Sequence, residues 1–159
     1  MSQPTEAPGF ADALVRLSHL VQHVFAEVSR QYDLTPQQSQ FLCMLAGGPV
    51  GMTELSRSLY LEKSSLTGLV DRAERRGLVA RTRGSRDRRA CQVVLTSEGA
   101  RLATECHEEV TARLETLAGE LLPIEREQLA SVITQILAEH TAATERVFPQ
   151  RSLQALNRA

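Results

Sequence analysis

Apolar residues recur along most of this chain with the period of an α-helix. Over residues 10–30 they alternate at steps of three and four, which predicts an amphipathic helix with a narrow apolar seam. The members of this seam are Leu14, Leu17, Val21, Val24 and Val28. Thr35 and Gln38 are spaced as a capping box that starts a second helix, and the run of residues 47–49, Gly-Gly-Pro, ends it.

Two shorter helices are expected next, over residues 52–59 and 63–76, with Gly77 placed to end the second. The pattern then changes to two short runs with β-type character on either side of a polar hairpin. The two runs and the hairpin between them are residues 78–83, 91–96 and 84–89.

The last third of the chain predicts two long helices. Thr96 or Ser97 caps the first, and its apolar residues recur at helical steps as far as Leu121. Pro123 is expected to break this helix. The second helix is expected from about residue 124 to 147, with one apolar face.

This order of elements predicts a mainly α fold with a small β-wing, in which a winged helix-turn-helix is flanked by long N- and C-terminal dimerisation helices. The expected segments are a disordered leader (1–9), an N-terminal dimerisation helix (10–34), a winged helix-turn-helix DNA-binding domain (35–99), C-terminal dimerisation helices (100–148) and a tail (149–159).

The charge of the chain is small overall but unevenly distributed. The net charge of −1 argues against a nucleic-acid partner. Residues 57–89, however, contain ten basic and four acidic side chains and carry +6, whereas the remainder carries −7. A basic segment of this kind attracts polyanions, so DNA is a candidate partner.

The helix over residues 63–76 carries the candidate contacts to the major groove. Its small hydroxyl residues lie near its start, where they allow a close approach to DNA and can bond to bases or phosphates. The candidate residues are Lys63, Ser64, Ser65, Thr67, Gly68, Arg72 and Arg75. Taken by itself, this helix is equally consistent with an ordinary solvated surface helix.

The hairpin strengthens the DNA interpretation, because its tip has no apolar residue to bury. Arg86, Arg88 and Arg89 surround a single acid, and arginine on a protruding hairpin suits the narrow, negative minor groove. We expect that acid, Asp87, to orient an arginine through a salt bridge to Arg72 or Arg89. A merely solvated loop is the alternative.

Two runs of sequence resemble the MarR family (multiple antibiotic resistance regulators). Residues 69–79, Leu-Val-Asp-Arg-Ala-Glu-Arg-Arg-Gly-Leu-Val, are similar to the end of that family's recognition helix, and residues 87–96, Asp-Arg-Arg-Ala-Cys-Gln-Val-Val-Leu-Thr, are similar to its wing. Residues 96–99 open the next helix as in the family. The resemblance covers about residues 10–146, and residues 53–99 are its specific part.

The resemblance implies a homodimeric bacterial repressor or activator that is released from its operator by a small molecule or by thiol oxidation. It also implies that Arg89 enters the minor groove and that the start of the recognition helix faces the major groove. Glu62 occupies the cap position where the family more often has Ser or Asp.

The terminal helices carry apolar seams far apart in sequence, and packing against a symmetric copy is the simplest way to cover them. The predicted dimer contacts are Leu14, Leu17, Val21, Leu129, Ile133 and Ile136. The alternative is a monomer whose three long helices form a closed bundle.

The sequence indicates the effector-binding residues much less clearly than the DNA-binding residues. By analogy of position with MarR relatives, the candidate effector residues are Arg16, His19, His23 and Tyr60. His19 and His23 are spaced i, i+4 and could pair on a metal, but no third ligand is evident, so neither a metal nor a cofactor is expected.

The three cysteines indicate free thiols in a reducing, cytoplasmic compartment. Cys91 lies beside Arg88 and Arg89, which favours the thiolate, so thiol oxidation at the wing is the alternative signal. Cys43 and Cys106 lie on apolar helix faces and are expected to be packing residues.

Other classes of function find little support. The chain has no run of 18 or more apolar residues, no signal-peptide pattern and no catalytic motif, so neither a membrane protein nor an enzyme is expected. The remaining rival is a winged-helix module that binds a protein partner. Such a module would be expected to carry apolar or aromatic anchors where this chain has arginine and hydroxyl groups.

Overall fold

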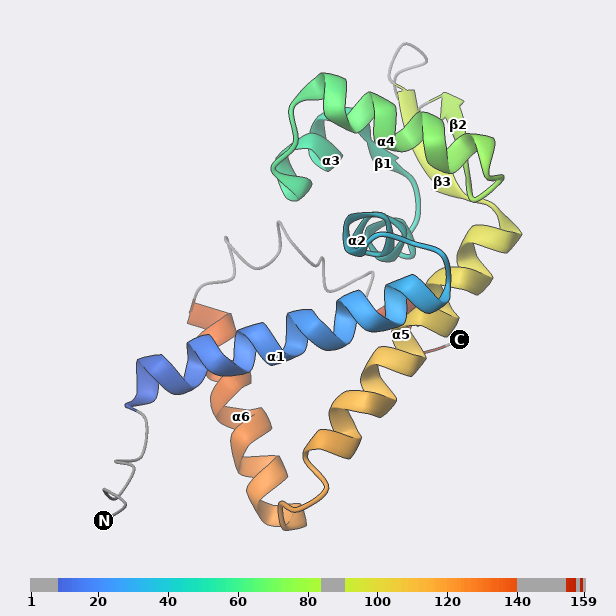
Figure 1. Cartoon of the computed structure of the whole chain (residues 1–159). Coiled ribbons are helices and arrows are strands. Elements are labelled where there is room, and N and C mark those ends of the chain that lie inside the picture. Colours follow the sequence, from blue (N-terminus) through green and yellow to red (C-terminus); the bar gives the residue numbers. More distant parts are fainter. Residues whose placement is uncertain (1–8, 84–90, 140–153, 157, 159) are drawn as a thin grey trace, which may run out of the picture.

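The computed structural model describes residues 9–83, 91–139, 154–156 and 158. Its elements are, in chain order, α1 (Phe10–Gln31), α2 (Pro36–Leu45), β1 (Val50–Gly51), α3 (Met52–Leu59), α4 (Lys63–Arg75), β2 (Val79–Arg83), β3 (Cys91–Leu95), α5 (Ser97–Leu117) and α6 (Pro123–Glu139). This is the predicted fold class, a winged helix-turn-helix between long terminal helices (Figure 1). None of the described helices is both long and apolar enough to cross a membrane.

The wing belongs to a three-stranded antiparallel sheet with strand order β1-β3-β2. Strand β2 pairs with β3 from Val79 opposite Leu95 to Arg83 opposite Cys91. The third strand, β1, was not predicted because it has only two residues and follows directly after a glycine- and proline-rich turn. Its Val50 is 2% exposed and lies opposite Val93 at the centre of the sheet.

The main hydrophobic core joins α2, α3 and α4 to the sheet and to the start of α5. Its fully buried side chains include Phe41, Leu55, Leu66, Leu69 and Val93, each at most 1% exposed. A smaller cluster lies between α1 and α5 and consists of Val24, Val28, Cys106 and Val110. The main core therefore packs the helix-turn-helix on the sheet, and the smaller cluster packs the second half of α1 against the middle of α5.

The local start and stop signals act largely as predicted. Thr35 forms the full capping box with Gln38. Gly77 has a φ of 70°, which glycine adopts without strain, and follows the end of α4. Of the two candidate caps for α5, Thr96 is the one that accepts a hydrogen bond, from the Gly99 N–H at 3.0 Å.

The end of α5 differs from the prediction. The helix stops at Leu117, short of Leu121, and a turn then leads to α6. Pro123 is the first residue of α6, a position where the missing N–H is not needed. The Glu125 carboxylate accepts a hydrogen bond from the Leu122 N–H and helps to fix this start. The predicted continuation of the last helix over residues 140–147 lies outside the described residues.

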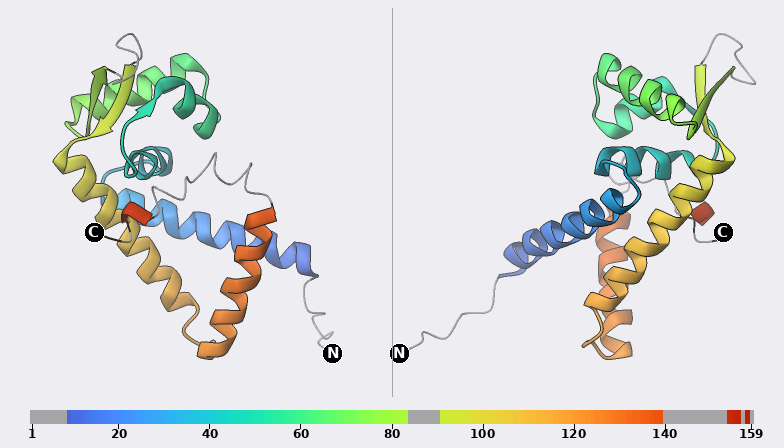
Figure 2. Two further views of the ribbon diagram at one scale, coloured as in Figure 1. Left: turned by 180° about the vertical axis from the view of Figure 1, so that it is seen from behind. Right: turned by 45° about the vertical axis from the view of Figure 1, so that its right-hand side comes forward.

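The terminal helices extend away from the winged domain. Helices α5 and α6 diverge from the turn that joins them like the arms of a V, and α1 crosses beneath α2 (Figures 1 and 2). None of the described residues of α6 is buried, and only Val24, Val28 and Ser29 are buried in α1. A closed bundle within one chain would bury these helices, so the structure does not show the monomeric alternative.

Candidate nucleic-acid interface

Helix α4 forms an outer edge of the winged domain, beside the two wing strands (Figure 1). One face packs inward through Leu66, Leu69, Val70 and Ala73, each at most 3% exposed. The exposed residues opposite are Lys63, Ser64, Ser65, Thr67, Arg72 and Arg75. The predicted division of this helix into a packed face and an outward face is confirmed. Its candidate DNA contacts are all exposed except Gly68, which is half-buried.

The helix begins at Lys63 as predicted, although Glu62 does not cap it. Glu62 has extended backbone angles, and its side chain makes no capping hydrogen bond. Its carbonyl oxygen accepts from the Leu66 N–H at 3.0 Å. Glu62 therefore leaves the first amide groups of α4 to water or to an external acceptor, and a phosphate is the acceptor that a helix N-terminus favours.

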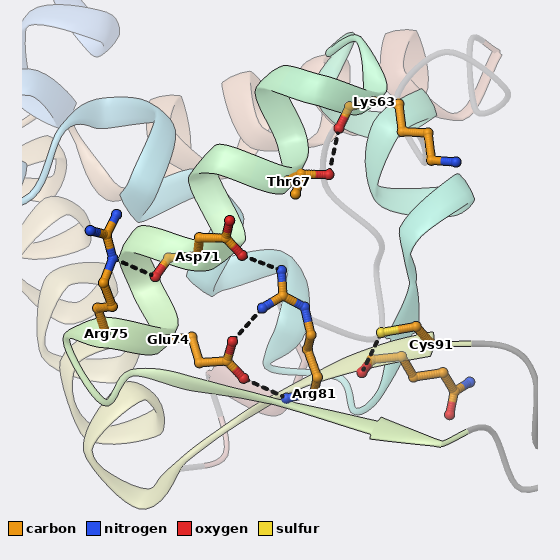
Figure 3. Close-up of polar contacts among 8 residues, drawn as sticks. Lys63, Thr67, Asp71, Glu74, Arg75, Arg81 and Cys91 are labelled. Carbon is orange, nitrogen blue, oxygen red and sulfur yellow. Dashed lines mark hydrogen bonds and ion pairs between the residues drawn. The ribbon is translucent and has the colours of Figure 1, made fainter.

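The hydroxyl group of Thr67 is partly committed within the helix. It donates to the Lys63 carbonyl oxygen at 2.8 Å, which leaves it free only to accept from a partner (Figure 3). At the next residue, a Cβ on Gly68 would lie 3.3 Å from an Arg72 guanidinium nitrogen. The Arg72 side chain thus lies back over Gly68 on the outward face of the helix.

Arg81 of β2 ties this helix to the wing. Its guanidinium group donates to Asp71 Oδ1 at 2.5 Å and pairs with Glu74 as well, and its backbone N–H donates to Glu74 Oε1 at 3.3 Å (Figure 3). Hydrogen bonding to Asp71 is the largest of the causes that raise the pKa of Arg81, so this arginine keeps its charge. This bridge is not visible in the sequence, because its partners lie seven and ten residues apart in different elements.

The basic side chains of α4 and β2 fall into two groups, those that pair with an acid and those that do not. Arg81 is neutralised by two acids, and Arg76 bonds to the Asp33 carbonyl oxygen at 2.6 Å and lies 3.8 Å from its carboxylate. Within the described part of the chain, no ion pair joins Lys63 or Arg72 to a carboxylate. Lys63 and Arg72 are therefore positive charges on the outward face of α4 that remain for a ligand.

The tip of the wing lies outside the described residues. The structure therefore does not describe Arg86, Asp87, Arg88 and Arg89. Their assignment as DNA contacts and the expected salt bridge of Asp87 stay predictions. The described strand ends put the exposed Arg83 opposite the exposed Cys91. Arg83 is therefore a further exposed arginine at the described end of strand β2.

The two helical cysteines are packing residues, as predicted. Cys43 is 2% exposed, and burial raises its pKa to about 12. Cys106 is 1% exposed, and burial raises its pKa as well, although Ser39 lies within hydrogen-bond distance of its sulfur at 3.3 Å. Cys91 is the exposed thiol, which leaves the redox alternative open only at the wing.

Of the four candidate effector residues, three lie on α1 and one lies in the turn after α3. Arg16 pairs with Asp12 at 2.9 Å and His23 lies 3.5 Å from Glu27, all on the outside of α1, where His19 is exposed too. Tyr60 lies in the turn between α3 and α4. Among the described residues, no group of three or more His, Cys, Asp and Glu side chains could hold a metal ion.

A cavity of about 620 Å³ lies instead between α1 and the start of α2. Its lining consists of Val21, Gln22, Phe25, Ala26, Pro36, Gln37 and Gln40. Only Val21 had been singled out by the sequence, as a dimer contact. The cavity escaped prediction because its lining is split between two helices and contains no charged residue or motif.

Comparison with known proteins gives consistent similarities. A family model described as the MarR family matches residues 32–90. The HTH-type transcriptional regulator FarR of Neisseria gonorrhoeae is 32% identical over 105 residues, which cover 65% of this chain and 72% of FarR. The crystal structure of apo MarR from E. coli superimposes with a TM-score of 0.73 at 24% identity, over 84% of this chain and 99% of MarR. The structure of NadR in complex with 4-hydroxyphenylacetate has a TM-score of 0.64 at 26% identity, over 86% and 97% of the two chains.

Proposed function

The chain belongs to the MarR family of DNA-binding transcriptional regulators, and from this premise we propose that it is a repressor that binds a pseudo-palindromic operator as a homodimer. Helix α4 enters the major groove, and the arginines of the wing enter the adjacent minor groove. The observation that carries this proposal is the outward face of α4, where Lys63 and Arg72 stand beside small hydroxyl residues and have no carboxylate partner within the described part of the chain.

The exposed seams of the terminal helices support the homodimer. Leu14 and Leu17 of α1 are 40% and 42% exposed, and Leu129 of α6 is 47% exposed. The other predicted contacts, Val21, Ile133 and Ile136, are half-buried. Large apolar side chains that alternate in this way along helices are typical of surfaces that bury against a partner.

The cavity between α1 and α2 supports release by a small-molecule effector. Its lining is mostly apolar, and Gln22, Gln37 and Gln40 supply amide groups that can bond to a ligand. NadR has been crystallised with 4-hydroxyphenylacetate, an anion, but the cavity here is lined by no cationic side chain. We therefore expect an uncharged, partly aromatic effector for this chain.

Salt-dependent binding to DNA tests the proposal. Fluorescence anisotropy should be measured between 50 and 200 mM salt on the DNA upstream of the protein's own gene and on a random duplex. We expect tight binding to the first duplex that falls steeply with salt, because each phosphate contact releases counterions. Equal, weak and salt-insensitive binding to both duplexes would favour the protein-binding alternative.

Two substitutions and a control separate the groove contacts. Arg89→Ala is expected to weaken operator binding by about 1–3 kcal/mol without loss of the fold. Ser65→Ala is expected to reduce the preference for operator over random DNA more than it reduces binding to random DNA. Arg101→Ala removes an equal charge from α5 and should leave both affinities unchanged. An equal loss for all three variants would contradict these roles.

A further inference from the structure

Tyr60 has a backbone conformation that tyrosine rarely adopts. It follows the last residue of α3 with a φ of 53° and a ψ of 38°, in the left-handed region where glycine is the usual residue. Its side chain is 70% exposed, the highest exposure among the large hydrophobic residues that the structure describes. Neither the turn nor the core therefore gains from a tyrosine at this position.

The turn around Tyr60 is fixed from both sides. The Leu61 N–H donates to the Ser56 carbonyl oxygen at 3.0 Å, and the Ser56 hydroxyl donates to the Leu61 carbonyl oxygen at 2.6 Å. Leu59 and Leu61, the neighbours of Tyr60 in sequence, pack into the main core. The phenol ring is thus the part of this turn that is held out into solvent on a rigid backbone.

This turn joins the two helices of the helix-turn-helix, and α4 begins three residues after Tyr60 (Figure 1). When the start of α4 enters the major groove, the segment just before it lies at the rim of the groove, where phosphates line the DNA backbone. A phenol hydroxyl is a neutral donor suited to a phosphate oxygen, and tyrosine is among the residues that make such contacts.

We propose that Tyr60 is a DNA-backbone contact whose hydroxyl group donates to a phosphate oxygen beside the groove that α4 reads. This inference rests on the proposed function, because it needs α4 to be the recognition helix. A strained residue without a structural role suggests a functional one, and the position of Tyr60 in the turn assigns that role to the DNA side of the domain. It replaces the expectation that Tyr60 lines an effector site.

The test uses two variants of the full-length protein and a duplex that the wild-type protein selects from a random pool. Tyr60→Phe removes only the hydroxyl group, and Tyr60→Gly removes the ring and the backbone strain together. We expect Tyr60→Gly to raise the melting temperature by about 2 °C. Both variants should bind the selected duplex and a random duplex about tenfold more weakly, because a phosphate contact does not depend on sequence.

A matched control isolates the effect of the backbone strain. Asp33 is the other described non-glycine residue with positive φ, and its side chain is fully exposed. Asp33→Gly also removes the carboxylate that lies 3.8 Å from Arg76, so it should raise the melting temperature without weakening DNA binding. The slope of affinity against salt should also stay at the wild-type value in both Tyr60 variants, because the lost contact carries no charge.

The outcomes distinguish failure of the inference from failure of the proposed function. If the wild-type protein selects a duplex and Tyr60→Phe binds it as tightly, the phosphate contact does not exist. Wild-type affinity in Tyr60→Gly would show that Tyr60 lies away from DNA altogether. Failure of the wild-type protein to select any duplex would overturn the proposed function, and the inference with it.

Discussion

We propose that a single residue, Gly68, serves DNA binding at the expense of stability. It lies in the middle of the 13-residue α4, where glycine costs roughly 1 kcal/mol relative to alanine. A Cβ at this position would meet only the flexible end of Arg72, at 3.3 Å, so packing does not require glycine. Under the proposed function, a close approach of the helix to DNA does, because a side chain here would stand between the helix and the groove.

Gly68→Ala is therefore expected to raise the free energy of unfolding by about 0.5–1 kcal/mol and to weaken operator binding. Urea unfolding and fluorescence anisotropy on one preparation would measure both. Thr111→Ala, at an exposed position of α5, is the matched control, because it improves helix propensity away from the DNA face. A variant that is more stable and binds the operator as tightly as the wild type would show that Gly68 is not at the DNA.

The cysteines should differ sharply in reactivity. Because burial raises the pKa of Cys43 to about 12 and also raises that of Cys106, both remain protonated thiols well above neutral pH. At pH 8 we expect one thiol per native chain, Cys91, to react with a maleimide, and three to react in denaturant. Mass spectrometry of the Cys91→Ser variant supplies the control. A second modified cysteine in the native protein would mean that the α1–α2–α5 junction opens.

At the scale of elements, Arg81 joins the recognition helix to the wing. The ion pairs with Asp71 and Glu74 are partly exposed, with Arg81 at 31% and the two acids at 48% and 40%. Pairs of this kind contribute little to folding, about 1 kcal/mol or less. Under the proposed function their larger effect concerns DNA, since without Arg81 two carboxylates are left uncompensated on the helix that is proposed to enter the groove.

Arg81→Ala should therefore lower operator affinity more than it lowers stability. Adding Asp71→Asn to this variant should restore part of the affinity, because it removes one of the exposed negative charges, while the lost stability is not restored. Anisotropy and urea unfolding of the single and double variants measure these two effects. If affinity and stability fall and recover together, Arg81 acts through folding alone.

The elements differ in how far the sequence could predict them, and the reason is the range of the interactions that form them. The cap at Thr35 and the buried face of α4 depend on residues within a few positions of each other, so their patterns are visible in the chain. Strand β1 exists only because it pairs with β3, more than forty residues later. The bridge from Arg81 likewise depends on how β2 lies against α4, which no local pattern specifies.

In the candidate site, too, the features set by neighbouring residues could be predicted and those set by distant residues could not. The outward residues of α4 were predictable, because a helix that buries every third or fourth residue must expose the ones between. The cavity between α1 and α2 was not, since its glutamine and apolar lining carries no signal in the sequence. The role proposed for Tyr60 depends on its backbone angles, and a tyrosine in a turn does not reveal a positive φ in the sequence.

For the whole molecule, the proposed function makes the unburied terminal helices the connection between dimerisation and DNA recognition. Two copies of α4 must lie about 34 Å apart to enter successive major grooves, and only a partner chain can supply the second copy. The exposed Leu17 on α1 and Leu129 on α6 are among the side chains that would set this spacing. Operator binding by the dimer should therefore depend on residues that never approach the DNA.

The double variant Leu17→Asp with Leu129→Asp tests this dependence, because a carboxylate buried without a partner strongly disfavours association. Light scattering should fall from the mass of two chains to the single-chain mass of 17.5 kDa. Because neither side chain is buried within one chain, the circular dichroism spectrum should retain its helical form. Operator affinity should fall at least a hundredfold, since each half-site then binds alone, while affinity for a single half-site changes little. A variant that stays dimeric would place the interface elsewhere, and a monomer with full operator affinity would separate dimerisation from recognition.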